Sequence, residues 1–218
     1  MANNSAMTTA AANTAENDRA RLKQIVASAV GPKPFSELYD VSLSHEGSSL
    51  SGKELFAAMV QAENDGRIAH VDAIGALTTA AIPLAVALIS AASQKGRALD
   101  AFTLDFVFPS TKGTPVAGKN VLLLDAWLSE RSYIQTSSIV TLHRGNELGL
   151  DFGILTSKGA TPVGIAALVG GTGALKGERA GLIRVINPAD GSASDLPFLH
   201  VLDVNEVSTF AAPNLETE

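Results

Sequence analysis

The chain has 218 residues, of which 16 are basic, 22 are acidic and none is cysteine, and its formal net charge is −6. These numbers exclude disulfide scaffolds, thiol nucleophiles and cysteine-ligated zinc, and they argue against a general nucleic-acid-binding surface. Hydrophobic residues make up 46% of the chain and aromatic residues only 5%, so Ala, Val, Leu and Ile must fill the core of one ordinary domain.

Both ends of the chain have the composition of flexible tails. Residues 1–18 are rich in Ala, Thr and Asn and lack the basic and apolar regions of a secretory signal. Residues 211–218 are similar and acidic. We therefore expect a tail over 1–18, one domain over 19–210 and a second tail over 211–218. The absence of cysteine is compatible with a reducing compartment, so the expected location is cytoplasmic.

Helical patterns alternate with short apolar runs along the domain. Apolar positions at helical spacing predict helices over 18–29, 53–64, 83–93 and 146–158. Apolar runs bounded by polar residues or glycine predict strands over 70–75, 101–108, 121–125, 163–169, 182–186 and 198–204. Two segments are expected to be irregular, namely 34–51, with at most a short strand at 39–43, and the polar loop 109–118. The alternation predicts an α/β fold with a mainly parallel central sheet flanked by helices.

One uncharged segment, residues 73–92, is long enough to cross a bilayer. Only seven of its 20 residues are Ile, Leu or Val, and Gly75 and Pro83 interrupt it. This weak hydropathy favours a buried strand, a tight loop and an Ala-rich packed helix over a membrane span.

Small residues follow the first predicted strand, from Gly75 to Pro83. In open α/β sheets, ligands bind beyond the carboxyl ends of the strands. Backbone amides at such a loop, together with the start of the next helix, suit an anion. The alternative is a tight turn that only packs under its helix.

Asp125 ends the clearest predicted strand and is followed by a Ser-rich stretch. A carboxylate there can orient ribose hydroxyls or a hydrated magnesium ion, and the nearby hydroxyls can donate to an anion. Trp127 and Tyr133 could stack on a base or contact a protein partner. The alternative reading makes Asp125 and the serines helix caps or solvent contacts.

A glycine-rich stretch over 170–177 imitates a dinucleotide-binding loop, but a charged segment follows it instead of an amphipathic helix. A lone glycine pattern is a weak signal. The four histidines show no metal-binding helical spacing, and no Gly-x-Ser-x-Gly elbow is present.

The order of these segments resembles the type I phosphoribosyltransferases, most closely the orotate phosphoribosyltransferases. Residues 71–85 resemble the strand, pyrophosphate loop and helix of that family. Residues 106–118 resemble its flexible catalytic loop, and 121–125 its phosphoribosyl pyrophosphate strand. Residues 159–169 resemble the turn and strand that follow. Together with their surroundings these pieces span roughly residues 19–207.

The resemblance implies a phosphoribosyltransferase-like sheet with a small N-terminal hood, a homodimer, and phosphoribosyl pyrophosphate or a nucleotide-like small molecule as ligand. It implies neither a nucleic acid nor a membrane as partner. Asp125 and Lys112 would be catalytic, and Asp125 would also face the Mg²⁺ ion that the family uses. Phosphate and ribose binding would fall on Ser129, Arg131, Ser132, Tyr133 and Thr136, and pyrophosphate binding on Thr78, Thr79 and Ala80.

The sequence departs from the family pattern at the phosphate loop. The family has two adjacent acidic residues, whereas here Ala126 follows Asp125. Residues 130–133 are Glu, Arg, Ser and Tyr where the family has small residues and glycine, which permit close backbone approach. Two functions therefore stay open. One is a protein that binds a phosphorylated ribose or nucleotide, with ordinary transfer opposed by the altered loop. The other is a non-catalytic regulatory or partner-binding module.

Overall fold

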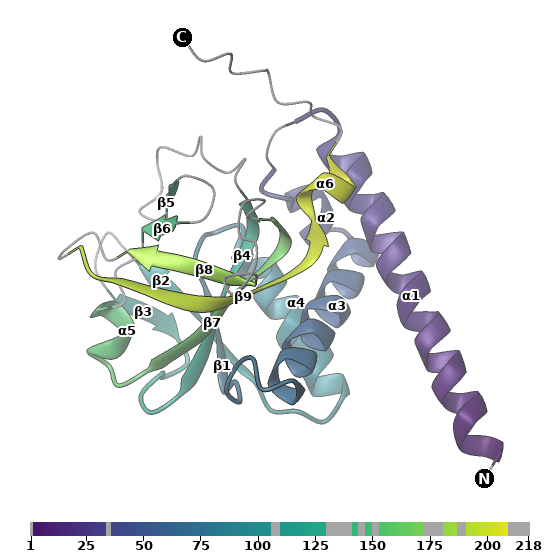
Figure 1. The fold of residues 1–218 in the computed structure, drawn as a ribbon, viewed down its shortest axis with the longest axis horizontal. Coiled ribbons are helices and arrows are strands. Elements are labelled where there is room, and N and C mark those ends of the chain that lie inside the picture. The colour runs from purple at the N-terminus through teal and green to yellow at the C-terminus, as the bar shows by residue number, and fades with distance from the viewer. Residues whose placement is uncertain are drawn as a thin grey trace.

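The structure of the chain is a computed structural model. It describes residues 2–33, 36–105, 110–129, 141–143, 147–149, 153–171, 181–186 and 191–208. Within these ranges, nine strands form one sheet in the order β3-β2-β1-β4-β7-β9-β8-β6-β5 (Figure 1). The middle of the sheet, from β2 through β1, β4 and β7 to β9, is parallel throughout. This confirms the predicted α/β class.

The parallel strands are β1 (Ala73–Ala76), β2 (Asp100–Asp105), β4 (Asn120–Ser129), β7 (Thr161–Gly171) and β9 (Ala193–Asp203). The others are β3 (Ser110–Gly113), β5 (Thr141–His143), β6 (Glu147–Gly149) and β8 (Leu182–Ile186). β3 is antiparallel to β2, β8 is antiparallel to β9, and β6 runs parallel to β8 and antiparallel to β5. All four residues of β1 are buried, as expected for a central parallel strand that is covered on both faces.

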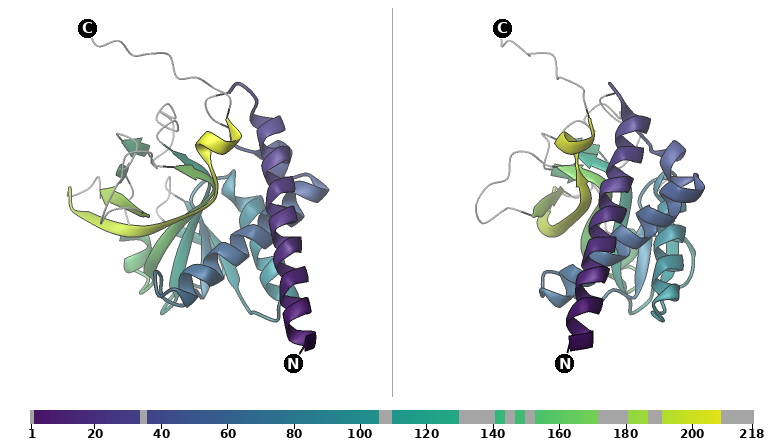
Figure 2. Two further views of the ribbon diagram at one scale, coloured as in Figure 1. Left: turned by 45° about the vertical axis from the view of Figure 1, so that its right-hand side comes forward. Right: turned by 90° about the vertical axis from the view of Figure 1, so that its right-hand side faces the viewer.

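Three long helices cover one face of the sheet: α1 (Ala2–Val30), α3 (His45–Asn64) and α4 (Ala81–Gln94). α1 packs along α3 at the outside of this layer (Figures 1 and 2). α3 and α4 approach closely because Gly52 has no side chain: a Cβ there would lie 2.4 Å from the Ala87 carbonyl oxygen. The short helices are α2 (Tyr39–Ser42), α5 (Gly153–Thr156) and α6 (Val204–Val207). Within the described part of the chain, every helix is too short or too polar to cross a bilayer.

The core has two halves, one on each face of the sheet. Leu122 and Leu124 of β4 belong to the half under the helices. Leu123 belongs to the other half, together with Phe102 of β2 and Leu155 of α5. β4 therefore lies between two apolar layers, which explains why its apolar run is the clearest strand signal in the sequence.

Several local predictions were wrong. Residues 39–42 form helix α2 rather than a strand, and α3 begins at His45, inside the segment expected to be irregular. The Ser44 side chain accepts a hydrogen bond from the Gly47 amide at 3.1 Å, which gives α3 an early start. The predicted polar loop contains β3, which gains ladder bonds from β2.

The predicted helix over 146–158 was also largely wrong. Its first part contains strand β6, which pairs with β8, and only α5 is helical. Gly159 does have the positive φ expected after a helix, 76°. α1 starts well before residue 18, at Ala2, while the division into two tails and one domain stays a prediction.

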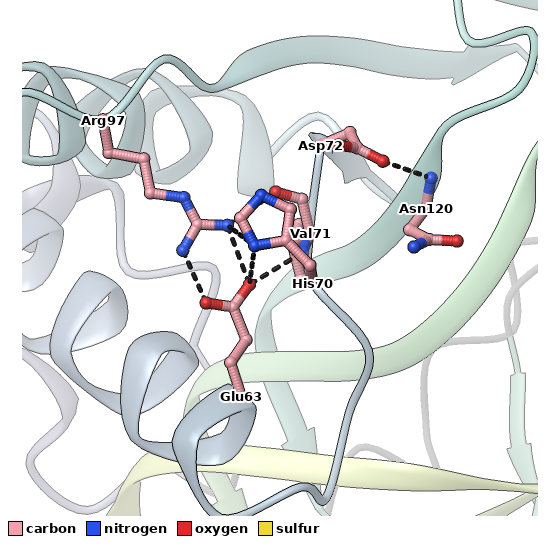
Figure 3. A network of polar contacts seen from close by, with 6 residues as sticks. All are labelled: Glu63, His70, Val71, Asp72, Arg97 and Asn120. Atoms are coloured by element: carbon pink, nitrogen blue, oxygen red, sulfur yellow. Dashed lines mark hydrogen bonds and ion pairs between the residues drawn. The ribbon is translucent and has the colours of Figure 1, made fainter.

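A polar network braces the amino-terminal ends of β1 and β4 (Figure 3). The Arg97 guanidinium donates to both oxygens of Glu63 and, at 2.7 Å, to the Val71 carbonyl. The Val71 amide donates to Glu63 at 2.7 Å. The Asp72 carboxylate accepts from the Asn120 amide at 2.9 Å, which ties the start of β1 to the start of β4.

Candidate functional site

The loop between β1 and α4 occupies the carboxyl edge of the parallel sheet. The Leu77 amide donates to the Leu124 carbonyl at 2.9 Å, which keeps the chain beside β4 for one residue beyond β1. Thr78 is half-buried, Thr79 is exposed and Ala80 is buried. The three residues assigned to pyrophosphate by the resemblance therefore lie in one short turn at the start of α4.

This turn supplies hydrogen-bond donors. The first amides of α4, those of Ala81 and Ile82, donate to the carbonyls of Thr78 and Thr79. The amides of Thr78, Thr79 and Ala80 have no acceptor among the residues that the structure describes. The first turn of α4 contains no acidic residue, so the positive end of the helix dipole is not neutralised there. Such an arrangement favours an anion.

Gly75 of β1 has a packing role rather than a ligand-binding one. A Cβ at this position would lie 2.5 Å from Cζ of Phe102 and 2.8 Å from Cδ2 of Leu123. The space that the glycine leaves is therefore filled by core side chains. For Gly75, this supports the alternative in which the small residue serves core packing and not ligand binding.

Asp125 does not end its strand. β4 continues to Ser129, and its backbone stays paired with β7 through the partners Leu128–Gly170 and Ser129–Gly171. The prediction that the strand stops at the carboxylate was wrong, because Ala126, Trp127 and Leu128 are buried and prolong the apolar strand. A strand thus occupies the position directly after Asp125, where the resemblance implies the start of a phosphate loop.

The Asp125 carboxylate is satisfied inside the protein. It accepts the Thr78 hydroxyl at 2.8 Å and the Ala126 amide at 2.6 Å, and the residue is only 7% exposed. Burial raises the pKa of Asp125 to about 6, although the Thr78 hydroxyl and the amides of Ala126 and Trp127 act in the opposite direction. The Glu37 carboxylate raises the pKa further. The groups that set this raised pKa of Asp125 are neutral hydrogen-bond donors and one carboxylate, with no cation among them.

Sequence reasoning missed the segment that brings Glu37 near Asp125. Leu38, the next residue, has φ of 58°, the only positive φ of a non-glycine residue in the described ranges. Its side chain is buried in the helix-side core, and its carbonyl accepts from the Val41 and Ser42 amides of α2. A left-handed leucine costs roughly 1 kcal/mol, so packing holds this conformation against local preference. No glycine marks the position, so the sequence carries no signal for it.

Lys112 lies away from Asp125. It is on β3 at the edge of the sheet, opposite Thr103 of β2, in the row that continues through Ala76 of β1 to Leu124 of β4. Three strand spacings separate the two ends of that row, roughly 14 Å. The Lys112 ammonium pairs with the Asp105 carboxylate at 2.6 Å. The structure does not bring the two predicted catalytic side chains together.

The remaining predicted site residues are only partly described. Ser129 is the last residue of β4, where its backbone pairs with Gly171. The other predicted phosphate and ribose residues, Arg131, Ser132, Tyr133 and Thr136, lie outside the described residues. Trp127 is buried in the core at 2% exposure, so the expectation that it stacks on a base or meets a partner was wrong.

The described residues do not fit a magnesium ion held by the protein. Mg²⁺ keeps several waters and takes one or two open carboxylates, whereas Asp125 is buried and accepts from a hydroxyl and the protein backbone. No group of three or more His, Asp or Glu side chains in the described ranges is placed to ligate a metal. We therefore assign no step to Mg²⁺.

Comparison with known proteins shows the fold. No protein-family model and no curated protein matches the sequence. The orotate phosphoribosyltransferase of Mycobacterium tuberculosis H37Rv in complex with 5-phospho-alpha-D-ribosyl 1-diphosphate is similar, with a TM-score of 0.54 and 21% identity over 88% of this chain and 92% of that one. Its complex with inorganic phosphate gives a TM-score of 0.55 and 23% identity over 87% of this chain and 90% of that one.

A phosphoribosyltransferase from Corynebacterium diphtheriae is also similar, with a TM-score of 0.52 and 19% identity over 88% of this chain and 98% of that one. The resemblance stated from the sequence is therefore confirmed at the level of the fold. At these identities the likeness concerns the fold and not the activity.

Proposed function

We propose that the protein binds a phosphorylated ribose or a nucleotide at the carboxyl edge of its sheet, and that ordinary phosphoribosyl transfer is not its activity. The observation that carries the binding proposal is the turn at residues 78–80. Its amides have no acceptor among the described residues and lie at the start of a 14-residue helix with no acid in its first turn. Amides in this position suit a phosphate or pyrophosphate group.

Three features argue against ordinary transfer. β4 continues as a paired strand where the family resemblance requires a phosphate loop. Asp125, which would steady the ribose, is buried and already accepts hydrogen bonds from the Thr78 hydroxyl and the protein backbone. Lys112, which would neutralise the leaving pyrophosphate, pairs with Asp105 at the far edge of the sheet. A phosphate-binding turn without an assembled reaction site among the described residues favours a binding protein over a transferase.

Isothermal titration calorimetry with phosphoribosyl pyrophosphate in magnesium buffer tests the binding proposal. We expect a dissociation constant in the micromolar range for the full chain. Thr79→Glu places a carboxylate at the exposed position of the turn. At about 4 Å from a phosphate, one like-charge pair costs about 1 to 4 kcal/mol, so the affinity should fall at least about fivefold.

The matched control is Thr161→Glu, the same change at an exposed threonine at the opposite, amino-terminal end of β7. It should leave the affinity unchanged. Absence of binding by the wild-type chain, or equal affinity of Thr79→Glu and wild type, would contradict the proposed site.

The second candidate function, a partner-binding module, has support from one surface. The large apolar side chains that are exposed among the described residues are Leu43, Ile82 and Val86, and the last two lie on α4. Leu43, at 70% exposure, and Val86, at 56%, line a groove of about 420 Å³ between the start of α3 and α4. Most of the other residues that line the groove are polar, among them Ser48, Lys53 and Gln94, so the support for an interface consists of the two exposed apolar side chains, Leu43 and Val86.

We therefore keep a homodimer as part of the proposal and assign this groove to it. Light scattering after size exclusion should give a dimer for the wild-type chain and a monomer for Val86→Lys. The control is Ala117→Lys, at an exposed position in the β3–β4 connection, and it should remain dimeric. A monomeric wild-type chain would remove the homodimer from the proposal without affecting the phosphate-binding turn.

A further inference from the structure

We draw no further inference here: the strongest candidate, the cavity of about 320 Å³ between α3 and β9 that is lined by Gln61, Arg67 and His200, also borders Gly181, and because residues 172–180 directly before that glycine lie outside the described residues, nothing in the structure shows what covers it.

Discussion

A carboxylate forms hydrogen bonds at each end of the β1–β4 strand pair, but the pKa values of the two carboxylates are shifted in opposite directions. At the amino-terminal end, burial raises the pKa of Glu63, yet the Arg97 guanidinium and the Val71 amide more than offset this and leave it below its usual value. At the carboxyl end, Asp125 has neutral hydrogen-bond donors, and burial raises its pKa to about 6. The first end is a brace in which the charge is compensated. The second holds a buried acid whose charge is only partly compensated.

This difference agrees with a structural role for the amino-terminal end and with the ligand-binding role that we propose for the carboxyl end. A compensated pair stabilises the fold at neutral pH and has little reason to open. A buried acid with a raised pKa carries a free-energy cost when ionised, and such groups concentrate at functional sites. The same strands thus connect a structural end and a candidate ligand-binding end.

Arg97→Ala should have the largest effect and would break the brace. It leaves the Glu63 carboxylate and the Val71 carbonyl without their guanidinium partner, and both Arg97 and Glu63 side chains are largely buried. Removal of one partner of such a pair costs about 3 kcal/mol. Urea unfolding followed by circular dichroism measures the change.

The control for the brace is Arg21→Ala, which removes a two-bonded ion pair with Glu46 on the surface. Its effect should stay below about 1 kcal/mol, because exposed ion pairs contribute little. Equal effects of the two substitutions would show that Arg97 is not a buried brace.

Asp125→Asn should change stability in the opposite direction at neutral pH. The pKa of Asp125 is raised in the folded state, so its contribution to stability is fully present below the unfolded pKa, near 4, and is lost as pH rises through about 6. The neutral amide avoids that loss. After allowance for the buried amide group, we expect a gain of about 1 to 2 kcal/mol at pH 7.

Urea unfolding of wild type and Asp125→Asn between pH 4 and pH 7 measures this effect. The difference between the two curves isolates Asp125, since Glu63, with its lowered pKa, loses its contribution as pH falls and is common to both proteins. A difference that does not vary with pH would show that Asp125 has an ordinary pKa in the folded protein.

Asp72→Ala tests whether the amino-terminal end of the β1–β4 pair contributes to stability and not to ligand binding. It leaves the Asn120 amide at the start of β4 without the carboxylate that accepts its hydrogen bond. We expect a loss of about 1 kcal/mol. Binding of phosphoribosyl pyrophosphate should be unaffected, because the substitution lies at the far end of the strands. Weaker ligand binding together with unchanged stability would reverse the roles that we assign to the two ends.

His70→Ala should have the smallest effect. The His70 side chain is 70% exposed and lies 3.4 Å from the Arg97 guanidinium through Nδ1. A change within about 0.5 kcal/mol is expected in the same urea experiment, as for most surface positions. A loss comparable to that of Arg97→Ala would make the histidine an essential member of the brace.

The sequence predicted the parts of the fold that depend on continuous apolar runs. The strand signal at 121–125 corresponds to β4, because a strand buried on both faces needs apolar residues at every position. The signal at 182–186 corresponds to β8, in which partly buried and buried residues alternate. The sequence also predicted a turn at Thr78 and Thr79 after a buried strand, and the structure has this turn between β1 and α4.

The rest depended on contacts between distant residues. An aspartate normally ends an apolar run, but here Thr78 and the backbone satisfy the carboxylate, so β4 continues past it. The left-handed Leu38 is held by its buried side chain and by α2, which local sequence does not reveal. The bond between Lys112 and Asp105 likewise follows from the pairing of β2 with β3.

Phosphorus NMR of phosphoribosyl pyrophosphate, mixed with the full chain in magnesium buffer and a panel of nitrogenous bases, tests the central claim most directly. It reports binding and turnover in one spectrum. We predict that the phosphate resonances broaden or shift as protein is added, and that no free pyrophosphate accumulates beyond a protein-free sample. Release of pyrophosphate with any base would contradict the absence of ordinary transfer, and unchanged ligand resonances would contradict the binding site itself.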